Sequence, residues 1–177
     1  MSQSMSRRRF LGTAAASAAL TTSSCSRVAA QSSAERPAND ACVFCEIVHG
    51  TRPASVVWQD DLTMAFIDLR QFHAGHTLVI PRKHLHDVRE LDNPTGAALM
   101  ASVARIARAV AAAFPNQGLS LWHSIGEAAH QEVPHLHVHV HPRLVGDGML
   151  QIYPSAAPLS DKLVRDNYAA TLRSHVD

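Results

Sequence analysis

The chain has 177 residues, with 16 Lys and Arg against 15 Asp and Glu, so its formal charge is +1 at pH 7. This length supports one domain with a buried core. The near-zero charge gives no reason to expect nucleic acid or a membrane surface as the partner. The composition is that of a globular protein, and its 12 histidines are the main departure.

The first 30 residues indicate an export signal rather than part of the fold. Arg7, Arg8 and Arg9 precede an apolar run over residues 11–20, which is too short and too weakly hydrophobic to span a bilayer. The start of this segment resembles a twin-arginine signal, and small residues at 28–30 offer a cleavage site. We therefore expect a periplasmic protein. Two alternatives stay open, a disordered basic tail and acylation of Cys25 as in bacterial lipoproteins.

The domain is expected over residues 41–145, after a flexible polar leader at 31–40. Apolar runs predict a hairpin of strands at 56–59 and 62–68, then strands at 76–80, 119–124 and 135–141. The strand at 119–124 should pair antiparallel with the last strand, because only a loop of about nine residues joins them.

A long helix is expected between the third and fourth strands. Asp92 or Asn93 can cap it, Pro94 suits its first position, and the pair at 114–115 closes it. Four apolar residues at helical spacing should form its buried face: Leu99, Val103, Ile106 and Val110. The tail at 146–177 should hold a second helix, from Asp161 to about Arg173 and capped by Ser160. The predicted class is α+β, a small antiparallel sheet with one long helix packed on it.

Four histidines fall on every second residue from His135 to His141. Since side chains alternate along a strand, this spacing predicts four imidazoles on one face and apolar residues on the other. Imidazoles crowded on one face suggest nucleophilic catalysis, metal binding or both. The alternative is a row of solvent-facing histidines without chemistry.

The run from Pro134 to Arg143 resembles the motif of the histidine-triad (HIT) family of nucleotide hydrolases and transferases, and the resemblance extends back to about Cys42. It implies the HIT fold, in which two protomers share a continuous sheet. His137 would be the nucleophile, His139 would orient it through its backbone carbonyl and contact the phosphate, and His76 would support the triad strand. His141 is a departure, because the family has an apolar residue there.

The resemblance also implies a nucleotide site. Asp68 matches a carboxylate that accepts from ribose hydroxyls, and Gly126 and Gln131 keep the spacing of a phosphate-binding loop. Ser124 replaces an expected asparagine and His130 replaces a glycine, whose role there can be close backbone approach or positive φ. Candidates to sandwich the base are apolar residues near this site: Phe44, Ile47, Phe66 and Leu69.

A Cys-x-x-Cys pair, Cys42 and Cys45, is compatible by itself with zinc or redox chemistry. With His84 and His135 it matches the ligand set of zinc-binding bacterial members of the family. Two thiolates and two imidazoles would fill all four positions of a tetrahedral ion, so the resemblance implies a structural zinc. A Cys42–Cys45 disulfide is the alternative in an oxidising compartment.

Three functional hypotheses follow. The first is an enzyme that cleaves at the α-phosphate of a purine nucleoside phosphoramidate or dinucleoside polyphosphate through a nucleotidyl-histidine. The second is an exported metal-binding protein, with His123, His130 and His141 as additional ligands. The third is a nucleotide-binding HIT protein that turns over slowly, owing to the changes at 124 and 130. We expect no membrane span and no nucleic-acid partner.

Overall fold

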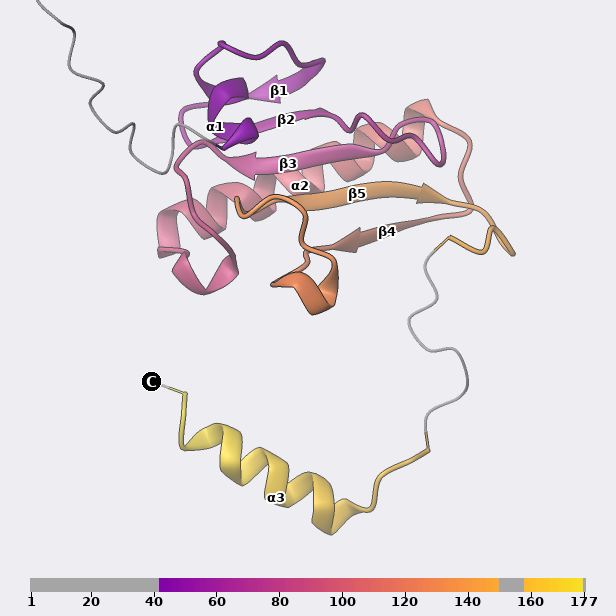
Figure 1. Ribbon diagram of the computed structural model, residues 1–177. Helices are drawn as coiled ribbons and strands as arrows, with labels where there is room; N and C mark the ends of the chain where they lie inside the picture. Colours follow the sequence, from indigo (N-terminus) through magenta and orange to yellow (C-terminus); the bar gives the residue numbers. More distant parts are fainter. Residues whose placement is uncertain (1–41, 150–157, 177) are drawn as a thin grey trace, which may run out of the picture. The chain divides into compact units, whose positions relative to one another are not determined.

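The computed structural model describes residues 42–149 and 158–176, so the predicted signal segment, Cys25 and the leader lie outside the described residues. Five strands form one sheet: β1 (Val56–Gln59), β2 (Thr63–Ile67), β3 (Thr77–Pro81), β4 (Gly118–Trp122) and β5 (Val138–Arg143). Their order across the sheet is β1-β2-β3-β5-β4, and each neighbouring pair is antiparallel (Figure 1). The predicted α+β class and the pairing of β4 with β5 are confirmed.

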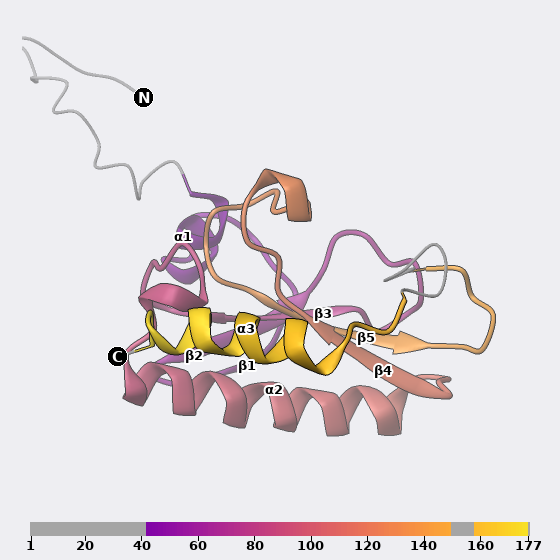
Figure 2. The same cartoon turned by 90° about the horizontal axis from the view of Figure 1, so that it is seen from below.

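Helix α2 (Asn93–Ala113) lies along one face of the sheet (Figure 2). The Asp92 carboxylate caps it by accepting from the backbone N–H of Thr95 at 2.8 Å. Its four predicted core residues are buried, and they pack with sheet residues that point to the same side, including Ala65, Val79 and Val140. Among the described helices, α2 alone is long and apolar enough to cross a membrane, but its apolar stripe covers the sheet.

A short helix, α1 (Val43–Val48), lies on the opposite side of the sheet (Figure 2). This helix was not predicted, because six residues are too few to show a helical period. Phe44 and Cys45 of α1 are buried in a second apolar cluster with Met64, Leu78 and Ile80. The Cys-x-x-Cys pair is thereby packed onto the sheet face that also bears His139 and His141.

The predicted histidine strand is wrong at its start, because β5 begins at Val138. His135 and His137 precede the strand. The backbone N–H of Leu136 donates to the carbonyl of Leu85 at 2.6 Å, outside the sheet, so this segment leaves the β3 ladder. The alternative of solvent-facing histidines is also wrong, because His135, His137 and His141 are buried and His139 is partly buried.

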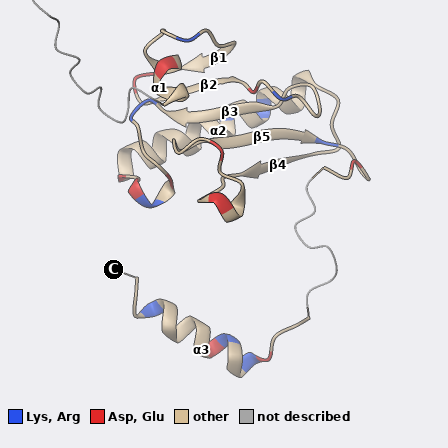
Figure 3. Cartoon of the chain, in the orientation of Figure 1, with Lys and Arg blue, Asp and Glu red and all other residues tan. Residues whose placement is uncertain are grey.

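Two 3-10 turns lie in the loops, η2 (Val88–Glu90) and η3 (Glu127–Ala129). Helix α3 (Lys162–Arg173) confirms the predicted tail helix, but its N-cap is Asp161, without a side-chain cap bond, rather than Ser160. The Ser160 carbonyl instead accepts from the guanidinium of Arg165. Charged residues occur mainly in loops, turns and helices, and the five strands carry a single one, Arg143 (Figure 3).

Candidate active site and metal centre

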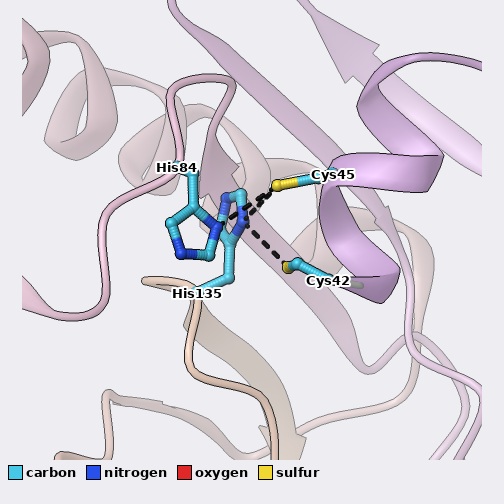
Figure 4. A group of neighbouring side chains, drawn as sticks. All are labelled: Cys42, Cys45, His84 and His135. Carbon is cyan, nitrogen blue, oxygen red and sulfur yellow. Dashed lines mark hydrogen bonds between the residues drawn. The ribbon is translucent and has the colours of Figure 1, made fainter. Parts of the chain in front are cut away.

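The four predicted metal ligands come together from three parts of the chain (Figure 4). Their ligand atoms all lie within 4.8 Å of one another. Nδ1 of His135 is 3.5 Å from Sγ of Cys42 and 3.6 Å from Sγ of Cys45, and Nδ1 of His84 is 3.2 Å from Sγ of Cys45. Ligands of a tetrahedral zinc ion have S···N separations of about 3.6 Å, so the spacing fits the ion.

The protonation states also fit a metal. Nε2–H of His135 donates to the carbonyl of Pro81 at 3.0 Å, which leaves Nδ1 bare and turned toward the sulfurs. Burial lowers the pKa of His135 to about 4, so this imidazole is neutral at neutral pH and able to bind a cation. Burial also lowers the pKa of His84. The four side chains therefore offer two sulfurs and two imidazole nitrogens at a spacing that could hold a metal ion.

His137 lies beside this cluster with one nitrogen engaged and one bare. Its Nδ1–H donates to the backbone carbonyl of His135 at 2.6 Å. The prediction that the His139 carbonyl accepts this hydrogen is wrong. His139 lies in β5, whereas His137 precedes the strand and donates to the carbonyl of His135. The Nε2 lone pair of His137 has no hydrogen-bond partner among the described residues. Burial lowers the pKa of His137, which keeps this lone pair available as a nucleophile.

His139 and His76 form a second imidazole pair. Nδ1–H of His76 donates to the carbonyl of Arg70 at 2.9 Å, so its Nε2 must accept from Nδ1–H of His139, also at 2.9 Å. Nε2 of His139 is therefore bare. Burial, with the neighbouring imidazoles next in effect, lowers the pKa of His139 to about 3. The pair lies next to His137, whose ring centre is 5.0 Å from that of His139.

The loop between β2 and β3 positions Asp68 and His76. The Gln71 amide fastens it from within, donating to the carbonyls of Asp68 and His76 and accepting from the backbone of Gly75 and His76. Asp68 Oδ2 lies 3.8 Å from Nδ1 of His76. Gly75 has a φ of +100°, and a Cβ there would lie 2.4 Å from the ring of Phe114. Only glycine fits this turn.

The predicted phosphate loop lies between β4 and β5. Oε1 of Gln131 accepts from the backbone N–H of Gly126 at 2.8 Å, and its Nε2 donates to the carbonyl of His86 at 2.9 Å. The Gln131 amide thus closes the loop in this structure. His130 has a φ of +61°, and it is the one residue other than glycine with positive φ in the described part of the chain. The loop therefore needs a left-handed residue where the family has glycine. Ser124 lies just beyond the end of β4.

The candidate base-contacting residues divide into two groups. Phe44 and Phe66 are buried and in edge contact with each other, with Ile47 packed against the same cluster. Leu69 is fully exposed. Phe44 also contacts His137 edge-on at 5.3 Å between ring centres, so it helps to fix the orientation of that imidazole.

Trp122 was not predicted from the sequence, and His123 was predicted only as an additional metal ligand. The Trp122 ring stacks on His139, with centres 4.2 Å apart and planes 7° apart, and it also stacks on His76. Nδ1–H of His123 donates to the carbonyl of His137 at 3.0 Å. The predicted pairing of the strand at 119–124 with the histidine strand could have indicated Trp122, because Trp122 lies opposite His139 in the register.

Comparison with known proteins agrees with this geometry. Residues 49–145 match the model of the HIT domain. The chain belongs to the HIT family. It is 38% identical over 117 residues to the protein named Protein hit of Bacillus subtilis, covering 66% of this chain and 81% of that one. A crystal structure of a HIT family member from the same organism superposes with a TM-score of 0.73, at 32% identity, over 77% of this chain and 98% of that one.

Two relatives carry names that state an activity. One is adenosine 5'-monophosphoramidase hnt1 of Schizosaccharomyces pombe, 31% identical over 58% of this chain and 74% of its own length. The other is adenylylsulfatase HINT3 of Arabidopsis thaliana, 32% identical over 58% of this chain and 52% of its own length. The HIT family thus includes hydrolases of nucleotide substrates.

Proposed function

We propose that this HIT protein hydrolyses or transfers nucleotidyl groups at the α-phosphate of a purine nucleoside phosphoramidate or dinucleoside polyphosphate. The observation that carries the proposal is the state of His137. Its Nδ1–H is held by the His135 carbonyl at 2.6 Å, and its neutral Nε2 has a free lone pair. That nitrogen forms a bond to phosphorus while the bond from phosphorus to the leaving group breaks. Water then cleaves the P–N bond, releasing the nucleotide and restoring the imidazole.

The His76–His139 pair can supply a proton for the leaving group. In the neutral pair His139 Nε2 is an acceptor, because its hydrogen lies on Nδ1. One added proton makes His76 a donor from both nitrogens, so that His139 accepts at Nδ1 and carries its hydrogen on Nε2. Asp68, 3.8 Å from His76, would balance the charge. General acid catalysis of this kind contributes about 10²–10⁴-fold in rate.

Substrate binding is proposed for residues that surround this pair. Asp68 would accept from the ribose hydroxyls, and Gln131 and the backbone near Gly126 would approach the phosphate. Because both atoms of the Gln131 amide are engaged at 2.8 and 2.9 Å, its Nε2–H must turn from the His86 carbonyl to reach a phosphoryl oxygen. Ser124 provides a hydroxyl in place of a carboxamide at the end of β4.

We further propose that Cys42, Cys45, His84 and His135 hold a structural zinc ion. We also propose that the protein is a homodimer. A twin-arginine signal would export it to the periplasm. Lipidation at Cys25 would instead anchor it to a membrane. The donor set and its spacing support the zinc. The arginines at 7–9 and the apolar run behind them support export.

The test is a search for the covalent intermediate. The protein is mixed with adenosine phosphoramidate, quenched in base and analysed by mass, and a nucleotidyl adduct on a peptide containing His137 is expected. His137→Ala should lose the adduct and nearly all AMP release while keeping one tightly bound zinc per chain. A wild-type protein that forms no adduct and releases no nucleotide from any phosphoramidate or dinucleoside polyphosphate would reject the proposal.

A purely metal-binding role is the competing hypothesis. Of its three additional ligands, His123 is hydrogen-bonded to the His137 carbonyl and His130 is exposed in the phosphate loop. Among the described residues, the groups of three or more potential ligands within 4.8 Å include neither of them, nor His141. This hypothesis predicts that His137→Ala lowers the metal content of the protein.

A further inference from the structure

Three imidazoles near the triad have a buried ring nitrogen without a hydrogen-bond partner among the described residues, and they belong to His73, His123 and His141. Nε2 of His141 and Nδ1 of His73 are both buried and make no hydrogen bond. His141 is fully buried, and its ring centre lies 5.4 Å from that of His73. A buried polar atom without a partner is destabilising, so two such atoms in rings that contact each other require an explanation.

The tautomer of His141 makes its bare nitrogen a ligand. Nδ1–H of His141 donates to the carbonyl of Pro142 at 2.7 Å, which leaves a lone pair on Nε2. His135 has the same arrangement, with one nitrogen donating to the Pro81 carbonyl and the other facing the sulfurs of the zinc-type cluster. Histidines that bind metals are oriented in this way by a backbone acceptor.

The surroundings are compatible with a cation. Asp147 Oδ2 lies 3.9 Å from Nδ1 of His73, and the Asp147 side chain is only 4% exposed. Arg143 is held by Asp147 at 2.6 and 2.8 Å, so its charge is balanced. His76 contacts His141 with ring centres 4.6 Å apart, but both of its nitrogens are already engaged. The protein donors are therefore the two imidazoles alone, because no group of three potential ligands among the described residues includes His141.

We propose that His73 and His141 form a second metal site for a late first-row divalent ion, such as nickel, copper or zinc. Two imidazoles on one tetrahedral ion have ring centres roughly 5 Å apart, given metal–nitrogen bonds of about 2 Å. Imidazole suits these ions, and water would complete the coordination. The ion would tie the loop that carries Asp68 and His76 to the end of β5.

Nickel binding to the zinc-loaded full-length protein tests this site, because nickel is redox-quiet and zinc can be counted separately. The wild type should bind one nickel equivalent in addition to its zinc, and nickel should raise its melting temperature. His141→Leu and His73→Ala should each weaken nickel binding at least tenfold while keeping one zinc. His175→Ala is the matched control, since it removes an exposed histidine near the end of the chain.

Several results would overturn the site. One is a wild type that binds no nickel, as expected if a buried water satisfies both nitrogens. Another is nickel binding that is unchanged in both variants, or reduced equally in His175→Ala. If His141→Leu does not fold, His73→Ala decides the matter, because His73 lies in a loop and is partly exposed. Nucleotide turnover is not a readout here, so the outcome is independent of the proposed catalysis.

Discussion

The backbone carbonyl of His135 accepts the Nδ1 hydrogen of His137 at 2.6 Å, while the His135 imidazole faces the sulfurs of Cys42 and Cys45. One residue therefore links the candidate metal centre, through its side chain, to the candidate nucleophile, through its main chain. The tautomer of His137 depends on where that carbonyl lies. A metal that fixes His135 would also fix the orientation of the His137 lone pair that we propose as the nucleophile.

Loss of the metal should accordingly impair both stability and turnover. Cys42→Ser removes one thiolate, and we expect the zinc content to fall, the melting temperature to drop and kcat to decrease about 10–100-fold, with a smaller change in KM. Metal analysis, thermal unfolding and steady-state kinetics measure these effects. Met100→Leu is the control, because it changes an exposed side chain of α2 that is not in the cluster. Full zinc content in Cys42→Ser would contradict the proposed ligand set.

Gly75→Ala should be strongly destabilising. The added Cβ meets the Phe114 ring at 2.4 Å, and φ at this position is +100°. Overpacking and a conformation unfavourable for alanine together cost about 2–4 kcal/mol in the free energy of unfolding. Urea denaturation gives this value. Gly118→Ala is the matched control, because its Cβ would meet nothing within 4 Å, and its stability should stay within about 1 kcal/mol of the wild type. Equal losses in both variants would disprove the steric argument.

His130→Gly should stabilise the phosphate loop. The φ of +61° is unfavourable for histidine, and glycine would relieve about 1 kcal/mol. His130→Ala keeps the unfavourable φ and should give no such gain, which separates backbone strain from the loss of the imidazole.

If the natural protein is slow because of this loop, Ser124→Asn combined with His130→Gly should raise kcat/KM sharply. No change in turnover would count against that explanation of the two departures.

The free energy of unfolding should decrease as the pH falls below about 6.5. The pKa of His139 is about 3 in the folded protein and near 6.5 when unfolded, so the unfolded state binds the extra proton as pH falls from about 6.5 to about 3. The free energy of unfolding is thus unaffected by His139 above pH 6.5, and protonation of the unfolded state lowers it as the pH falls from about 6.5 to about 3. Denaturant titrations at pH 7.5, 6 and 5 should show a falling free energy of unfolding, and His139→Gln should reduce that slope.

The pH dependence of kcat/KM should also reflect the burial of an imidazole, in this case that of His137. Because burial lowers the pKa of His137, its Nε2 stays unprotonated below the ordinary imidazole range. The acidic limb of kcat/KM for phosphoramidate hydrolysis should therefore fall below pH 6.5. An acidic limb centred at or above 6.5 would show that the nucleophile is solvated rather than buried.

Much of the fold was predictable from local patterns. The helical spacing of Leu99, Val103, Ile106 and Val110, with Asp92 and Pro94 ahead of them, predicted α2 and its buried face. Apolar runs predicted the first four strands to within a few residues. The start of β5 was not predictable, because period two is satisfied equally by a strand and by the extended segment that turns toward Leu85. Helix α1 was too short to show a period.

The sequence by itself determined the chemistry available to this protein: the alternating histidines, the Cys-x-x-Cys pair, the carboxylate of Asp68 and the family to which they belong. The resemblance had already implied His135 for the metal and His137 for the chemistry. Only the tertiary structure decided the contacts of each imidazole. It brought His135 next to the sulfurs, gave Nδ1 of His137 the carbonyl of His135, paired His139 with His76 against Trp122, and packed His141 against His73. The reason is physical. A residue's type is local, but the tautomer and pKa of an imidazole depend on the carbonyls, rings and solvent around it, which distant parts of the chain supply.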